Sequence, residues 1–231
     1  MKLIAIIQAR VSSLRLPTKV MTKVKHKPIL EYVYERVNLI KKINKIVVAT
    51  SHHREDNLIN EYCNLKKICC YRGPLNNVAK RILNAAKKYQ ADGFIRISAD
   101  SPLLDFNNIE RGIYFFNIKK HDILTNIFPR TFPHGQSFEI INTKSYEKIY
   151  KKIKTKFDQE HVTSYIYNNY KSFKIFSYRN DVDLHNYNFS IDTKYDLLKF
   201  SAIVKAMNKN HTEYNLIDII KIFNKIKKNI L

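Results

Sequence analysis

The chain opens on L-I-A-I-I at residues 3–7, a run of apolar residues that no polar side chain interrupts. Such a run predicts a strand that is buried on both faces, as in the interior of a parallel sheet. The segment K-I-V-V-A-T at 45–50 repeats the pattern. Between the two runs, apolar residues recur at helical spacing behind Pro28, which suits a first helical turn. Two buried strands joined through a helix form a βαβ unit, which constrains the fold to a parallel sheet.

The same alternation continues along the first half of the chain. Strands are predicted at 68–71, 94–98 and 122–126, and helices near 58–63, 78–89 and 107–118. The second half is less regular, with strands predicted at 137–141, 173–178 and 187–191 and helices at 143–153, 159–169, 194–207 and 216–228. Because strands alternate with helices, we expect an α/β fold with a mostly parallel sheet and helices on both faces. No repeat, linker or change of composition divides residues 1–231, so we expect one domain.

Composition narrows the class of protein. Hydrophobic residues make up 45% of the 231 residues and charged residues 26%, as in ordinary folded soluble proteins. No stretch approaches the roughly 20 apolar residues that a membrane-spanning helix needs. The apolar start is followed at once by Gln8, Arg10 and Arg15 without a small-residue cleavage site, which argues against a signal peptide. We therefore expect a cytoplasmic protein without a membrane partner.

The net charge of +21 suggests anionic partners, but its distribution matters. Lysines are scattered in pairs along the whole chain, and neither zinc-finger spacing nor an RNP-type aromatic run accompanies them. We therefore expect no nucleic-acid binding. The three cysteines, Cys63, Cys69 and Cys70, are odd in number and include an adjacent pair. That pattern argues against a disulfide framework and a structural zinc site, and predicts reduced thiols.

The loop after the first predicted strand gathers charge at a position that favours ligand binding. Residues 8–19 contain three cations, Arg10, Arg15 and Lys19, together with several hydroxyl groups. In open parallel sheets, ligands bind beyond the carboxyl ends of the strands. A triphosphate needs several cations and hydrogen-bond donors around its oxygens. The loop is therefore a candidate triphosphate site, although a solvated basic loop would have the same composition.

The run I-I-Q-A-R-x-x-S-x-R-L-P-x-K at 6–19 resembles the N-terminal signature of the cytidylyltransferases that activate sugar acids. That family includes the CMP-Kdo and CMP-acylneuraminate synthetases, and the motifs most resemble its branch named after spore-coat polysaccharide biosynthesis. Further resemblances follow in the same order: K-P-I-L at 27–30, Y-R-G at 71–73 with Val78 and Arg81, R-I-S-A-D-S-P-L at 96–103, E-H-V-T at 160–163 and S-I-D-T at 190–193. The resemblance implies a Rossmann-like fold of the nucleotide-diphospho-sugar transferase type.

The resemblance also implies roles for individual residues. The expected nucleotide-binding residues are Ala9, Arg10, Ser13, Arg15, Lys19, Arg72 and Ser98. Arg10 and Lys19, together with Asp100, are the expected catalytic residues. Asp100 and Asp192 are expected to hold Mg²⁺, which prefers carboxylate, water and phosphate oxygens. Judged without the resemblance, Asp100 also suits a plain turn after a strand, and Asp192 also suits a helix N-cap.

The resemblance also points to residues that would contact the acceptor. The candidates are His134, Gln136, Glu139, Glu160 and His161. The alternative is that they are ordinary polar residues of loops and helix starts. Several positions depart from the family: His26 replaces a usual glycine, Asn77 stands where the branch has Asp, Ser98 where the Kdo enzymes have Gln, and F-P-H-G-Q-S-F-E at 132–139 is less acidic than its counterpart.

The resemblance implies transfer of CMP from CTP to an anionic sugar of the 2-keto-3-deoxy acid type, with release of pyrophosphate, for surface polysaccharide. Two alternatives stay open at this point. One is a nucleotidyltransferase that acts on a sugar phosphate or another phosphorylated acceptor, and the other is a non-catalytic nucleotide-binding paralogue. Members of the family are often dimers, so the resemblance also leaves a homodimer open.

Overall fold

The computed structural model describes residues 1–12 and 15–227. At its centre lies a sheet with the strand order β5-β4-β1-β6-β8-β7-β9. Strand β1 (Leu3–Gln8) pairs in parallel with β4 (Lys45–Ser51) and β6 (Gly93–Ser98), and β4 pairs in parallel with β5 (Cys70–Gly73). These four strands were all predicted from their apolar runs, and the predicted mostly parallel sheet is confirmed.

The remaining strands of the sheet are shorter and of mixed direction. Strand β8 (Glu139–Asn142) is antiparallel to both β6 and β7 (Ile123–Thr125), and β9 (Ile175–Ser177) runs parallel to β7 at the edge. The predicted strand at 187–191 does not form. Only an isolated bridge between Asn188 and His134 is found there, because this segment runs past a loop and not along a strand.

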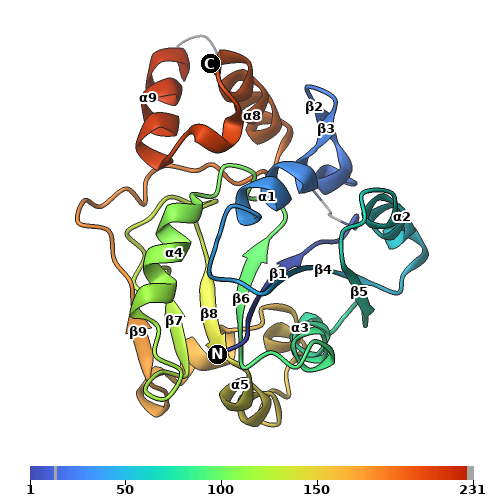
Figure 1. The fold of residues 1–231 in the computed structure, drawn as a ribbon, viewed down its shortest axis with the longest axis vertical. Coiled ribbons are helices and arrows are strands. Elements are labelled where there is room, and N and C mark those ends of the chain that lie inside the picture. Colours follow the sequence, from blue (N-terminus) through green and yellow to red (C-terminus); the bar gives the residue numbers. More distant parts are fainter. Residues whose placement is uncertain (13–14, 228–231) are drawn as a thin grey trace.

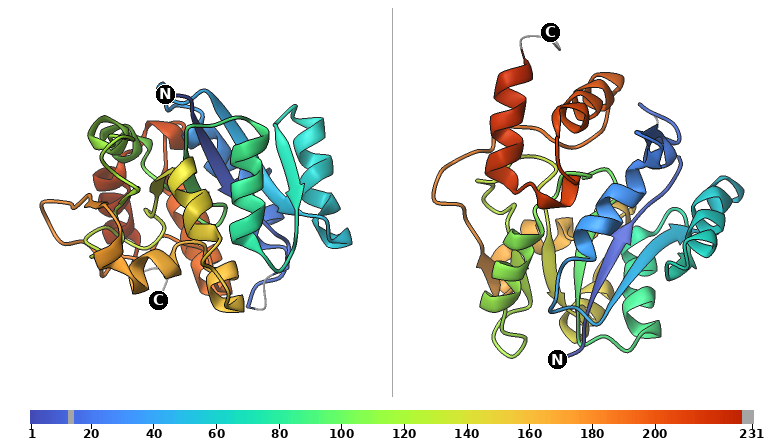
Figure 2. Two further views of the ribbon diagram at one scale, coloured as in Figure 1. Left: turned by 90° about the horizontal axis from the view of Figure 1, so that it is seen from below. Right: turned by 45° about the horizontal axis from the view of Figure 1, so that its top comes forward.

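Helices cover both faces of the sheet, as Figure 2 shows. Because side chains alternate along a strand, Leu3, Ala5 and Ile7 of β1 pack on one face and Ile4 and Ile6 on the other. The first face is covered by α1 (Ile29–Val37), α2 (Asn57–Leu65) and α4 (Phe106–Phe115). The second face is covered by α3 (Val78–Lys88), α5 (Thr143–Tyr150) and α7 (Ser164–Asn168), and the short helix α6 (Lys156–Glu160) packs against α3.

Helices α6 and α7 replace the single helix predicted at 159–169. The chain breaks between them at Val162, whose φ of 47° lies in the left-handed region that a helix cannot continue through. Val162 itself is completely buried, and Tyr146 donates a hydrogen bond to its carbonyl oxygen. Tertiary packing therefore overrides the local helical pattern, and the break leaves Glu160 at the end of a short helix.

The loop predicted between residues 8 and 27 contains a small hairpin. Strands β2 (Lys23–Val24) and β3 (Lys27–Pro28) are antiparallel, and the two residues between them, Lys25 and His26, have φ values of 45° and 70°. Two consecutive left-handed residues are typical of a tight two-residue turn. Glycine, asparagine or aspartate usually occupy such a turn. Because Lys25 and His26 stand there instead, the sequence did not predict the hairpin.

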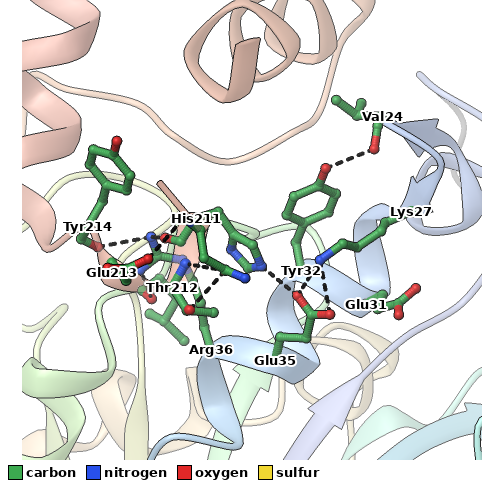
Figure 3. A network of polar contacts seen from close by, with 12 residues as sticks. Val24, Lys27, Glu31, Tyr32, Glu35, Arg36, His211, Thr212, Glu213 and Tyr214 are labelled. Atoms are coloured by element: carbon green, nitrogen blue, oxygen red, sulfur yellow. Dashed lines mark hydrogen bonds and ion pairs between the residues drawn. The ribbon is translucent and has the colours of Figure 1, made fainter. Parts of the chain in front are cut away.

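The last two helices, α8 (Lys194–Ala206) and α9 (Leu216–Ile226), pack against each other beyond the end of the sheet opposite the N-terminus (Figure 1). Figure 3 shows the polar contacts that join this part to α1. Arg36 is completely buried and donates to the carbonyl oxygens of Leu104, His211 and Tyr214. No helix within residues 1–12 and 15–227 is long and apolar enough to cross a membrane.

Candidate functional site

A cleft of about 1260 Å³ is lined by residues at the carboxyl ends of β1 and β6. The ends of β1 and its neighbours are held in register here, because Ala9 N–H donates to Ala49 O at 3.1 Å and Ala99 N–H to Gln8 O at 3.0 Å. The loops that follow these strands therefore all begin at the same edge of the sheet. This is the position at which parallel sheets bind ligands.

Lys19 is a charged group of the cleft with three close oxygen partners. It begins the short 3₁₀ helix Lys19–Met21 and is only 9% exposed. Its ammonium nitrogen lies 2.9 Å from Oδ2 of Asp100, 2.8 Å from Oδ1 of Asp192 and 2.8 Å from the carbonyl oxygen of Ile191. Burial alone would lower the pKa of Lys19, but the two carboxylates outweigh burial and raise the pKa above its ordinary value. Lys19 therefore carries a full positive charge at neutral pH.

The two carboxylates around Lys19 come from distant parts of the chain. Asp100 follows β6, and its carbonyl oxygen accepts a hydrogen bond from Ile191 N–H at 2.9 Å, which places the segment before α8 beside it. The N-cap of α8 is Thr193, whose hydroxyl accepts from Asp196 N–H. Asp192 is thus not the cap residue that its sequence position also suited, and its carboxylate is directed to Lys19 and the cleft.

The two arginines of the loop also meet carboxylates across the cleft. Arg10 pairs with Glu160 at 2.7 Å, and Arg15 approaches Asp192 at 3.3 Å. These side chains are more exposed than Lys19, so each pair contributes little to stability. The arrangement gives every described cation of the loop an anionic partner that phosphate oxygens can replace.

The structure brings most of the expected nucleotide and metal residues to this cleft. Its lining includes Ala9, Arg10, Arg15, Lys19, Ser98, Asp100, Glu160 and Asp192. Ser13 lies outside the described residues. Arg72 does not line the cleft. Its guanidinium donates to the carbonyl oxygens of Ser51 at 2.8 Å and His53 at 3.1 Å, and so braces the ends of β4 and β5.

Four of the five expected acceptor residues lie elsewhere. Gln136 is 1% exposed, and its amide group is used inside the protein, donating to Leu103 O at 2.7 Å and accepting from Asp105 N–H at 2.8 Å. His134 forms main-chain bonds with the segment around Asn188, and the ring of His161 packs on Phe157. None of these three residues lines the cleft.

Glu139, the fourth, is also buried. It is 2% exposed, forms an ion pair with Arg96 at 2.6 Å, and accepts a hydrogen bond from Tyr167. Arg96 in turn donates from Nε to the side-chain oxygen of Gln8 at 2.9 Å, and Gln8 lines the cleft. Glu139 therefore does not line the cleft in this structure, and is connected to it through Arg96 and Gln8. Glu160 is the expected acceptor residue that lines the cleft.

Several cleft residues were missed from the sequence. The start of α2 contributes Asn57, Leu58 and Glu61, and these residues follow β4. The rule that ligands bind beyond strand ends applies to β4 as it does to β1, so that signal was present. The second missed feature is Asp56, which is 1% exposed and accepts a hydrogen bond from Val11 N–H at 2.7 Å. Its carboxylate holds the loop after β1 in place.

The donor set at Lys19 is suited to Mg²⁺. Asp100 and Asp192 share one ammonium group at 2.8–2.9 Å, so their oxygens are close enough to share a cation. No cluster of three or more His, Cys, Asp or Glu residues with metal-binding geometry occurs in the described part of the chain. Mg²⁺ is commonly bound by one or two carboxylates together with water and substrate phosphates, so two carboxylates are a sufficient set.

Comparison with known proteins gives a consistent assignment. The family model described as cytidylyltransferase matches residues 4–226. A solved structure of a cytidylyltransferase from Leptospira borgpetersenii superposes with a TM-score of 0.92 at 31% identity, covering 99% of this chain and 95% of that one.

Curated relatives extend the comparison. An uncharacterized protein of Methanocaldococcus jannaschii is 38% identical over 76% of this chain and 71% of its own length. A spore coat polysaccharide biosynthesis protein of Bacillus subtilis is 26% identical over 86% of this chain and 84% of its own length. A 3-deoxy-manno-octulosonate cytidylyltransferase of Solibacter usitatus is 28% identical over 45% of this chain and 40% of its own length, less than half of either protein.

Proposed function

This chain belongs to the cytidylyltransferase family, and we propose that it transfers CMP from CTP to an oxygen atom of an acidic sugar, with release of pyrophosphate. As a member of this family, the chain is a nucleotidyltransferase. The acceptor that we propose is a sugar acid of the 2-keto-3-deoxy type, used for a surface polysaccharide. The similarity to a spore coat polysaccharide biosynthesis protein and to a 3-deoxy-manno-octulosonate cytidylyltransferase supports this choice.

The observation that carries the proposal is the group formed by Lys19, Asp100 and Asp192 at the carboxyl ends of the strands. A buried ammonium between two carboxylates is well placed to exchange those carboxylates for phosphate oxygens. In the nucleotide complex, Lys19 and the two arginines of the loop would offset the charge on the phosphates. Binding in a fixed geometry and charge neutralisation are the main sources of rate enhancement in phosphoryl and nucleotidyl transfer.

The carboxylates released by Lys19 would hold Mg²⁺. Bound Mg²⁺ supplies further charge neutralisation at the phosphates and helps to orient them. On the protein side, Asp100 and Asp192 are kept in place by the hydrogen bond between Ile191 N–H and Asp100 O. Both carboxylates are partly exposed, at 23% and 34% of their side chains, so a ligand entering the cleft can reach them.

The acceptor would enter beside Glu160, where Arg10 is also available. Glu160 now pairs with Arg10 at 2.7 Å. When Arg10 turns to the phosphates, the Glu160 carboxylate becomes free to accept a hydrogen bond from an acceptor hydroxyl. The acid group of the acceptor would take up positive charge in the same cleft, where Arg15 is 69% exposed.

The test is a screen for pyrophosphate release, with CTP, UTP, GTP and ATP combined with a panel of sugar acids and of phosphorylated small molecules. We expect release with CTP and a sugar acid. Release only with a phosphorylated acceptor would contradict the proposed acceptor and favour the second type of nucleotidyltransferase. No release with CTP and any acceptor would contradict the proposed reaction.

Two variants test the site itself. Lys19→Ala and Asp100→Asn are each expected to lower CTP turnover by about two to four orders of magnitude. The first removes a cation at the phosphates, and the second removes a carboxylate that would hold Mg²⁺. Lys23→Ala, at an exposed lysine four residues from Lys19, is the matched control and should retain activity. Circular dichroism should show all three variants folded. Normal turnover in Lys19→Ala and Asp100→Asn would contradict the assignment.

A further inference from the structure

The outer side of α5 and of the segment that follows it carries the densest positive charge of the sequence. Residues 144–156 contain six lysines and one acidic residue, and no other stretch of this length has as many lysines and arginines. All six lysines are exposed: Lys144, Lys148, Lys151, Lys152, Lys154 and Lys156. The proposed reaction assigns no role to them. Figure 1 shows α5 on the outside of the molecule, next to α3.

The buried and the exposed residues of α5 lie on opposite sides of the helix. Tyr146, Ile149 and Ile153 are buried and pack in the core on the second face of the sheet. The helical turn continues past the end of α5, because Lys152 N–H donates to Ile149 O and Ile153 N–H donates to Tyr150 O. Four lysines therefore recur at the spacing i, i+4, i+7 and i+8, which places them on one side of the helix: Lys144, Lys148, Lys151 and Lys152.

The acidic side chains in and directly after this stretch are already paired. Glu147 forms an ion pair with Lys87 of α3. Asp158 is buried and accepts hydrogen bonds from the hydroxyl groups of Thr155 and Ser164. Within residues 1–12 and 15–227, none of the six lysines forms an ion pair with a carboxylate. Because like charges four residues apart on a helix repel each other, the arrangement costs stability and gains no ion pair in return.

An exposed aromatic side chain lies next to the lysines. Phe157 follows Lys156 in the first turn of α6 and is 60% exposed. Its ring contacts that of His161, with 4.3 Å between the ring centroids, and it belongs to none of the hydrophobic clusters of the described residues. We call the six lysines together with Phe157 the basic face. This surface combines positive charge with a large apolar group in contact with water.

The chemistry of the basic face favours a lipid surface over a specific phosphate site. Its cations are all lysines, which are strongly hydrated point charges, whereas bidentate recognition of a phosphate favours arginine. A membrane that contains anionic phospholipids requires no such geometry, because each lysine near its surface strengthens binding by about fivefold. An aromatic side chain adds apolar contact at the boundary between the headgroups and the acyl chains.

We propose that the basic face attaches this protein reversibly to a membrane surface that contains anionic phospholipids. The lysines contact the headgroups, and Phe157 enters the boundary with the acyl chains. The attachment is peripheral and requires no part of the chain to span the bilayer. The sequence alone predicted no membrane partner, because the lysines are scattered when the whole chain is considered, whereas the structure gathers six of them on one surface. The proposal goes beyond the proposed reaction and does not depend on it.

Attachment through the basic face brings the cleft close to the membrane. Helix α6 begins at Lys156 and ends at Glu160, which lines the cleft. Because a helix rises about 1.5 Å per residue, Phe157 and Glu160 lie about 5 Å apart along the helix axis. The cleft therefore takes up and releases its ligands beside the membrane surface.

The experiment measures cosedimentation of the full-length protein with vesicles of phosphatidylcholine alone, and with vesicles in which about one third of the lipid is phosphatidylglycerol. The basic-face variant combines four substitutions: Lys148→Gln, Lys151→Gln, Lys152→Gln and Lys154→Gln. The matched control removes the same charge from exposed lysines of α8, α9 and the segment between them, at the other end of the molecule in Figure 1: Lys205→Gln, Lys209→Gln, Lys221→Gln and Lys225→Gln. Phe157→Ala removes the aromatic ring, and circular dichroism verifies the folding of every variant.

The wild-type protein should bind the anionic vesicles and not those of phosphatidylcholine alone. The basic-face variant should bind the anionic vesicles about a hundredfold more weakly or worse, because it lacks four lysines that each contribute about fivefold. The control variant should bind almost as well as the wild type, since salt screens charges far from the membrane surface. Phe157→Ala should weaken binding about tenfold and leave its salt dependence unchanged, because it removes apolar contact but no charge.

Three results would overturn the proposal. The first is a wild-type protein that does not bind anionic vesicles. The second is an equal loss in the basic-face variant and the control, since binding would then follow the net charge of the whole protein. The third, measured by fluorescence anisotropy, is tighter binding to a single-stranded RNA than to the vesicles that is lost in the basic-face variant, which would assign the face to nucleic acid. If the basic-face variant does not fold, the double variant Lys151→Gln and Lys154→Gln replaces it, with an expected loss of about twentyfold.

Discussion

The contact between α1 and the segment before α9 makes the stability of this protein depend on the protonation of His211. His211 is 6% exposed, and its Nε2 lies 2.6 Å from Oε2 of Glu35, which also receives the ammonium of Lys27 at 2.7 Å (Figure 3). Its Nδ1 has no hydrogen-bond partner among the described residues. Burial lowers the pKa of His211 from 6.5 to about 4. The charge of Arg36 also lowers this pKa, whereas the contact with Glu35 raises it.

The sign of the effect follows from which state binds the proton first. As pH falls, the unfolded chain protonates His211 near pH 6.5, whereas the folded protein resists protonation until about pH 4. The free energy of unfolding therefore falls between about pH 6.5 and about pH 4. Below that range, protonation of His211 lowers it no further. For the two pKa values, the loss between pH 7 and pH 5 is about 2 kcal/mol. The lowered pKa of Glu35 adds its own loss as pH falls below about 4.5, the ordinary value of that carboxyl group.

The measurement is urea unfolding of the wild-type protein and of His211→Gln at pH 5, 6, 7 and 8. Glutamine retains a donor at the position of Nε2 but does not titrate. The difference in unfolding free energy between the two proteins should therefore shift by about 2 kcal/mol in favour of the variant between pH 7 and pH 5. Other histidines are common to both proteins and cancel. Parallel pH profiles for the two proteins would refute the reasoning.

Three further predictions concern the loops and the site. His26→Gly should raise the free energy of unfolding by up to about 1 kcal/mol, since the φ of His26 is 70°; a loss in urea unfolding would contradict this. Gly135→Ala should lower it by about 2–3 kcal/mol, because φ is 84° and a Cβ would lie 2.5 Å from the main chain of Phe189 and Ser190; wild-type stability would count against the packing described. Chelation of divalent ions should abolish CTP turnover, and Mg²⁺ should restore it; activity in excess chelator would argue against a metal at Asp100.

The order of strands and helices along the first half of the chain could be predicted from local pattern. Buried parallel strands are continuous apolar runs, and a run such as 3–7 identifies its own element without knowledge of its neighbours. The second half was predicted less well. The segment 187–191 has the composition of a strand, but strand formation requires a partner edge, and none is available along the loop at His134.

The candidate site, like the fold, could be predicted only in part. The loop after β1 could be located from the sequence, because its cations follow a strand end and ligands bind there. The roles of its residues remain predictions. Polar residues of 132–139 were expected at an acceptor site, whereas Gln136 and Glu139 are buried with internal partners. The sequence shows that a residue is polar, but it does not show whether the chain provides a buried partner for it.

By itself, the sequence determined the alternation of elements, the parallel centre of the sheet and the position of the cation-rich loop at the end of β1. These features depend on short-range periodicity and on the geometry common to all βαβ units. Only the tertiary structure decided which groups meet. Lys19 contacts Asp192 across 173 positions of the chain, and Arg81 is buried against Gly73 without an acceptor for its Nε among the described residues. Such contacts depend on how distant segments pack, and no local pattern encodes them.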